Sequence, residues 1–135
     1  MTQPERQAIA ALATLILLQM IMLSALYAGI KPHPPAATPL FGIAPFLGAS
    51  VSIALAALIV QPLSNTWGRF LSVLAGLTAL VSFGPHKYFD MQFALIWPVV
   101  ILGQIAAAVI FARVVVAIGQ PGETVVTTRT IEGQQ

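Results

Sequence analysis

The chain of 135 residues has no cysteine and very few charged side chains. Without cysteine it forms no disulfide, thiolate metal site, iron–sulfur cluster or cysteine nucleophile. Charged residues make up 7% of the chain, against about 25% in a soluble domain. Six basic and four acidic side chains are too few to cover the surface of a water-soluble domain of this size. We therefore expect the lipid bilayer to be the solvent for most of the chain.

Clustered charge is also lacking, although the net charge is +2. Phosphate binding needs several Lys and Arg side chains close together. The basic residues of this chain occur singly along the sequence, at Arg6, Lys31, Arg69, Lys87, Arg113 and Arg129. This spacing argues against a nucleic-acid partner.

Apolar sequence, in contrast, is abundant, since hydrophobic residues make up 58% of the chain. A membrane-spanning helix needs about 20 mostly apolar residues. Four prolines and a histidine lie between Pro32 and Leu40, so this segment is predicted to be a connection. The sequence predicts an all-α integral membrane protein, a four-transmembrane-helix bundle of two consecutive helical hairpins, in residues 1–119. The predicted spans are Ala8–Ile30, Phe41–Val60, Trp67–Gly84 and Phe93–Ile118.

Prolines mark all three connections, and two more prolines fall inside predicted spans. Pro98 is expected to kink the fourth helix, whereas it is open whether Pro45 breaks the first turn of the second. Residues 120–135 form a polar tail that we expect to be cytoplasmic and disordered. A short edge strand against a partner is the alternative for this tail.

The basic residues also predict an orientation. Four arginines lie on the side of the two termini and of the second connection, and two lysines, Lys31 and Lys87, lie on the other side. Because positive residues favour the cytoplasmic side, we expect both termini in the cytoplasm and the chain in the cell (inner) membrane. The first span is longer than a signal-peptide core and lacks a clear cleavage site, so we interpret it as a retained helix.

The two hairpins show a weak internal likeness. Both outer connections contain Lys, His and Pro, and aligning the second and fourth spans pairs Phe41 with Phe93 and Ile53 with Ile105. A parallel duplication of one hairpin is therefore a hypothesis.

Titratable side chains gather in the outer connections, and these are the candidate functional cluster. An imidazole near neutral pKa can shuttle protons or bind a metal, although the spacing here is not that of a known metal motif. In the alternative interpretation the aromatic residues form an interfacial belt, the lysine extends toward the headgroups, and Asp90 caps the fourth helix. The cluster comprises His33, His86, Lys87, Tyr88 and Asp90.

Three polar residues lie within the predicted spans, namely Gln19, Gln104 and Arg113. Each glutamine is expected to form an interhelical hydrogen bond, with a ligand contact as the alternative. Arg113 either extends to the membrane edge or faces an acidic headgroup or a partner's carboxylate.

Small residues recur at every fourth position in three of the spans. Such patterns let helix backbones approach closely, although the sequence does not show whether they face inward or outward. The residues are Gly48, Ser52 and Ala56, then Ser72 and Gly76, then Gly103 and Ala107.

No Gly-rich phosphate-binding loop, Ser-centred nucleophile elbow, paired carboxylates or haem-attachment motif is present. Whether the chain binds a cofactor is therefore left open by the sequence. Our first hypothesis is an accessory or interaction subunit of a larger membrane complex, or a homo-oligomer, rather than an enzyme. One alternative is an oligomeric transporter or channel subunit for a neutral or lipophilic solute. The other is a lipid- or quinone-directed membrane enzyme with His86 as general base.

Overall fold

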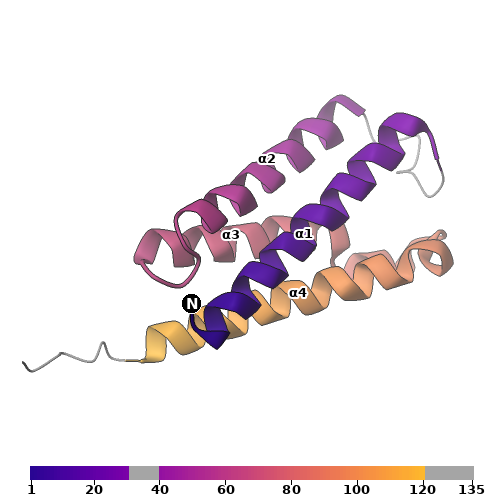
Figure 1. The fold of residues 1–135 in the computed structure, drawn as a ribbon. Coiled ribbons are helices and arrows are strands. Elements are labelled where there is room, and N and C mark those ends of the chain that lie inside the picture. Colours follow the sequence, from indigo (N-terminus) through magenta and orange to yellow (C-terminus); the bar gives the residue numbers. More distant parts are fainter. Residues whose placement is uncertain (31–39, 121–135) are drawn as a thin grey trace, which may run out of the picture.

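Four long helices make up most of the chain (Figure 1). The computed structural model describes residues 1–30 and 40–120. Its helices are α1 (Gln3–Ala28), α2 (Leu40–Ile59), α3 (Thr66–Phe83) and α4 (Phe93–Gly119), and a short 3₁₀ helix, η1 (Pro85–Phe89), lies between α3 and α4. By length and composition, all four long helices are able to cross a membrane, which confirms the predicted number of apolar helices. The predicted tail lies outside the described residues, apart from Gln120.

α2, α3 and α4 begin and end within one residue of the predicted spans, whereas α1 begins five residues before its predicted span and ends two residues before the end of that span. A capping box causes this early start. The Thr2 N–H donates to Glu5 Oε2 at 2.9 Å, and the Glu5 N–H donates to Thr2 Oγ1 at 3.4 Å. α1 ends before Gly29, whose φ of +64° is favoured by glycine. α2 and α4 continue through Pro45 and Pro98, so Pro45 does not break α2.

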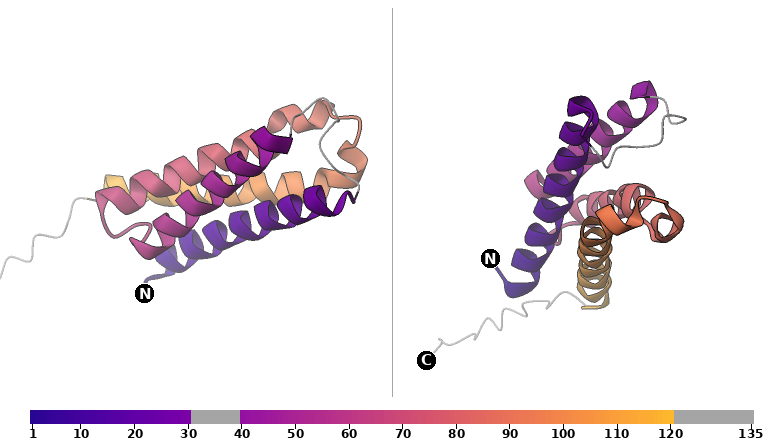
Figure 2. Two further views of the ribbon diagram at one scale, coloured as in Figure 1. Left: turned by 90° about the horizontal axis from the view of Figure 1, so that it is seen from above. Right: turned by 90° about the vertical axis from the view of Figure 1, so that its right-hand side faces the viewer.

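The helices form a ring of antiparallel neighbours. α1 contacts α2, α2 contacts α3, α3 contacts α4, and α4 closes the ring on α1. Among the described residues, α1 and α3 also touch across the middle, whereas α2 and α4 do not. The α1–α2 hairpin crosses the α3–α4 hairpin at an angle (Figure 2). As a result, α1 and α4 diverge toward the end of the bundle that carries η1 (Figure 1).

Small side chains fill the centre of the bundle and let the backbones come close. The ring of Phe111 packs directly against Gly76, and the side chain of Phe83 packs directly against Gly103. A Cβ atom at either glycine would lie within 3 Å of the phenylalanine side chain. This close packing joins α3 to α4. The buried apolar core includes Leu12 and Leu15 of α1 together with the alanines Ala54, Ala57, Ala75, Ala79, Ala106 and Ala107.

Two polar contacts define the end of the bundle opposite η1. Ser64 Oγ donates to Glu5 Oε1 at 3.0 Å and thereby joins the start of α1 to the α2–α3 turn. Arg69 Nε donates to the Leu63 carbonyl at 3.0 Å in the same turn. The C-terminal part of α4 lies at this same end. Arg6, Arg69 and Arg113 therefore lie toward the end opposite η1, and Lys87 lies at the η1 end.

The α2–α3 turn packs against the start of α3 without room for a side chain. Asn65 caps α3, because its Oδ1 accepts the Gly68 N–H at 2.8 Å. A Cβ at Gly68 would overlap the backbone carbonyl of Gln61, which itself has a left-handed φ of +67°. Backbone atoms yield less than a flexible side chain, so glycine is required at position 68.

Gly68→Ala is therefore expected to destabilise the bundle by about 1–3 kcal/mol, the usual cost of overpacking. A thermal unfolding series in detergent measures the effect as a fall in Tm. Gly48→Ala is the matched control, since no atom lies within 4 Å of a Cβ at Gly48 and alanine favours helix. Equal Tm values for Gly68→Ala and the unsubstituted chain would contradict the close contact at Gln61.

Candidate functional site

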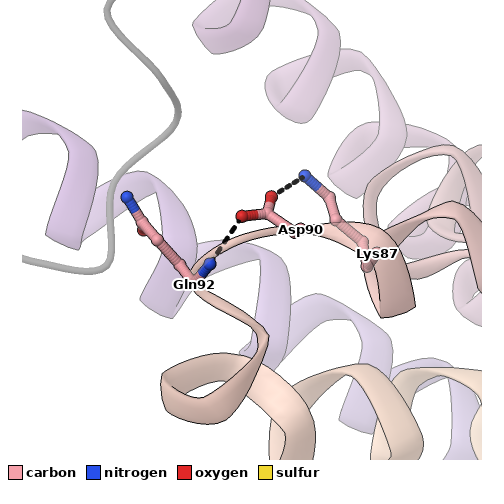
Figure 3. A network of polar contacts seen from close by, with 3 residues as sticks. All are labelled: Lys87, Asp90 and Gln92. Carbon is pink, nitrogen blue, oxygen red and sulfur yellow. Dashed lines mark hydrogen bonds and ion pairs between the residues drawn. The ribbon is translucent and has the colours of Figure 1, made fainter.

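The charged groups of the predicted cluster meet at the turn between η1 and α4 (Figure 3). Lys87 Nζ lies 3.8 Å from Asp90 Oδ2, and both side chains are partly buried. The other carboxylate oxygen of Asp90, Oδ1, accepts the backbone N–H of Gln92 at 2.9 Å. The carboxylate therefore both closes the turn and pairs with the lysine.

Asp90 does not cap the fourth helix, contrary to one of the two interpretations of the sequence. α4 begins at Phe93 with Gln92 at the cap position, and no side chain accepts a hydrogen bond there. Asp90 lies two residues too early, and its backbone carbonyl accepts the Phe93 N–H at 3.0 Å. Its side chain forms a turn with the Gln92 N–H instead.

A cavity of about 190 Å³ opens beside this turn, where α1 and α4 diverge. Its walls are mostly apolar and come from α1, the end of α3 and the first half of α4, including Met22, Phe83 and Val100. Lys87 and Asp90 are part of the lining. The cavity therefore combines an apolar interior with one cationic and one anionic group, an arrangement suited to part of an amphiphilic molecule.

The remaining members of the predicted cluster are Tyr88, His86 and His33. Tyr88 Oη donates to Gln104 Oε1 at 2.9 Å, and Gln104 Nε2 donates to the Phe83 carbonyl at 3.1 Å. Gln104 therefore forms the expected interhelical hydrogen bond and connects η1, α3 and α4. His86 is exposed and is not among the residues that line the cavity, and His33 lies outside the described residues. In residues 1–30 and 40–120, no three His, Asp or Glu side chains lie close enough to hold a metal ion.

Gln19 is fully buried and begins a polar chain across three helices. Its Nε2 donates to Ser50 Oγ at 2.6 Å, and Ser50 Oγ donates to Thr78 Oγ1 at 2.8 Å. Thr78 Oγ1 donates in turn to the Ala75 carbonyl at 3.0 Å. Gln19 Oε1 has no partner among the described residues. Ser50 and Thr78 are not among the predicted functional residues, although each carries a hydroxyl group near the middle of a predicted span.

Arg113 is half-buried in an open groove between α1 and α4, toward the end opposite η1. The groove has a volume of about 550 Å³ and is lined mostly by apolar side chains, with Gln7 on the α1 side. Arg113 is therefore placed beside a space large enough for a lipid chain.

The small-residue positions fall into two groups. Ser72, Gly76, Gly103 and Ala107 are buried between helices, and they are thus part of the packing of this bundle. In α2, Gly48 and Ser52 are exposed and Ala56 is half-buried, so this face points away from the other helices. We call Gly48, Ser52 and Ala56 the α2 small-residue face.

No family model, curated protein or solved structure matches this chain at a significant level. Any function must therefore be inferred from the residues of the chain itself.

The polar chain gives a prediction about stability. Ser50→Ala leaves the buried Gln19 side chain with no partner at either end and is expected to lower the free energy of unfolding by about 0.6–2 kcal/mol. Gln19→Leu removes the unpartnered oxygen while Ser50 still donates to Thr78, so stability is expected to be unchanged or higher. Unfolding curves of both variants in detergent test this, with the exposed Ser24→Ala as control. If Gln19→Leu lowers stability as much as Ser50→Ala, Gln19 Oε1 has a partner.

Proposed function

We propose that this chain is a multi-pass protein of the cell membrane that acts by helix–helix association, either with itself or as an accessory subunit of a larger membrane complex. The membrane location is supported by the side chains that cover the outside of the bundle. Large apolar residues are exposed along all four helices, and a surface of this kind is unfavourable in water. Examples are Leu17, Ile21, Leu55, Leu77, Val81, Leu102, Ile105 and Val115.

Exposed aromatic residues occur toward both ends of the bundle, as in membrane proteins with interfacial belts. Trp67 and Phe70 lie at the start of α3, and Tyr88, Phe89 and Trp97 lie around η1 and the first turns of α4. The arginine-rich end would be cytoplasmic, because positive residues are retained on that side. Both termini would then be cytoplasmic, and η1 would face the outside.

A cysteine-labelling experiment tests this orientation, and the natural absence of cysteine makes each introduced thiol unique. Met91→Cys, at a fully exposed position of the η1–α4 connection, is expected to react with a membrane-impermeant maleimide in intact cells. Ser64→Cys, in the α2–α3 turn, is expected to react only after the membrane is disrupted. Labelling of Ser64→Cys alone in intact cells would reverse the orientation, and labelling of both would contradict spanning helices.

The α2 small-residue face is the observation that supports association. Small residues have no packing role toward lipid, whereas they let a second helix approach the backbone closely. Ser52 Oγ already donates to the Gly48 carbonyl at 2.8 Å, so this face carries no unpaired hydroxyl donor that would disfavour an apolar contact. A helix of a second copy or of another subunit would pack against it.

Ser52→Leu is expected to reduce association, because the larger side chain keeps a partner helix away from the α2 backbone. Ser24→Leu is the matched control. Ser24 is likewise exposed, on α1, and its hydroxyl donates to the Met20 carbonyl at 2.8 Å, so the two substitutions change the same chemistry. Size-exclusion chromatography after mild extraction measures the assembled fraction. An equal effect of the two substitutions, or none of either, would contradict the proposed face.

The cavity beside η1 supports a second candidate, the binding of a lipophilic molecule such as a lipid or quinone at the outer surface. Apolar walls would hold the tail, and Lys87 and Asp90 would face the polar part. Since His86 does not line this cavity, its proposed role as a general base has no support from the geometry.

A further inference from the structure

The groove between the first half of α1 and the second half of α4 combines an apolar wall with polar groups from both helices. Its wall is formed by small and aliphatic side chains, among them Ala10 and Ala11 of α1 and Val109 of α4. Three polar residues also line it, Gln7 and Thr14 from α1 and Arg113 from α4. The Thr14 hydroxyl donates to the Ala10 carbonyl at 2.8 Å, so its donor is already satisfied within α1. Arg113 precedes the end of α4 by fewer than two turns, so its guanidinium is within reach of the membrane surface.

The charge of Arg113 is not neutralised by any residue that the structure describes. In those residues Arg113 forms no hydrogen bond or ion pair, and the acidic residue at this end, Glu5, accepts hydrogen bonds from Thr2 and Ser64 instead. Arg6 and Arg69 lie toward the same end. Among the residues that the structure describes, the groove therefore lies in a region of net positive charge, which complements an anionic group.

Gln7 supplies a hydrogen-bond acceptor at the groove. Its Oε1 is shielded from solvent and has no hydrogen-bond partner among the described residues. A buried carbonyl oxygen without a donor is unfavourable, so a donor supplied by a ligand would stabilise this arrangement.

We propose that this groove binds one anionic phospholipid whose headgroup carries a hydroxyl, the chemistry of phosphatidylglycerol. The phosphate pairs with Arg113, the Gln7 amide rotates so that its Oε1 accepts a hydrogen bond from a headgroup hydroxyl, and one acyl chain lies along the apolar wall. A zwitterionic headgroup fits less well, because its ammonium would lie close to the arginines of this end. The inference rests on the proposed membrane location and is independent of the α2 small-residue face.

Native mass spectrometry of the full-length protein in detergent, with equal amounts of phosphatidylglycerol and phosphatidylethanolamine, tests the proposal. The unsubstituted chain is expected to retain phosphatidylglycerol preferentially. Arg113→Gln should reduce this preference about fivefold, the effect of one interfacial arginine. Arg6→Gln makes the same change of charge at the same end outside the groove and should retain the preference. An equal loss in both variants would indicate general attraction to anionic lipid, and it would overturn the site.

A second pair of variants tests the acyl-chain part of the site. Ala10→Phe places a ring in the groove and should abolish retention of phosphatidylglycerol, whereas Ala108→Phe, at an exposed position of α4 that does not line the groove, should not. Added glycerol 3-phosphate should leave the bound lipid in place, because it has the headgroup chemistry without the chain. Retention by Ala10→Phe, or displacement by glycerol 3-phosphate, would contradict a lipid held in the groove.

Discussion

Close approach of helix backbones is the constraint on which the rest of this structure depends. Apolar side chains gain little by leaving lipid for the interior of a bundle, so helices in a membrane are held together by packing and by hydrogen bonds between them. The alanine-rich centre and the two glycines that receive Phe111 and Phe83 provide this packing. The polar chain from Gln19 and the contacts of Gln104 add hydrogen bonds across the same interfaces.

The sequence was sufficient to predict the helical layout, because charges and prolines separate apolar segments of the length that a bilayer requires. It was less informative where local hydrogen bonds decide. α1 begins before its predicted span because the capping box of Thr2 and Glu5 stabilises a first helical turn. The residues of this turn are mostly polar, so hydropathy does not include them in a membrane span. Pro45 and Pro98 lie within continuous helices, since each removes only one backbone donor close to a helix start.

The proposed functional surfaces could be predicted only in part, because periodicity gives the spacing of residues but not the direction in which they point. The same four-residue pattern is buried in α3 at Ser72 and Gly76 and exposed in α2 at Gly48 and Ser52. Contacts between segments that are separated in the sequence could not be predicted either. Tyr88 was predicted to lie in the outer cluster, and Gln104 was predicted to lie within a membrane span. In the structure, the Tyr88 hydroxyl donates a hydrogen bond to the Gln104 side chain. Both proposed surfaces, the α2 small-residue face and the Arg113 groove, therefore depend on the three-dimensional arrangement.

The most direct test of the central claim is native mass spectrometry of the tagged chain after mild extraction from its own membrane. Association through the α2 small-residue face predicts a complex of fixed ratio, composed either of copies of this chain or of this chain and other membrane subunits. A lone monomer would contradict the proposed association. If that monomer retained a lipophilic molecule other than the phospholipid expected in the Arg113 groove, the cavity beside η1 would be favoured as the centre of function.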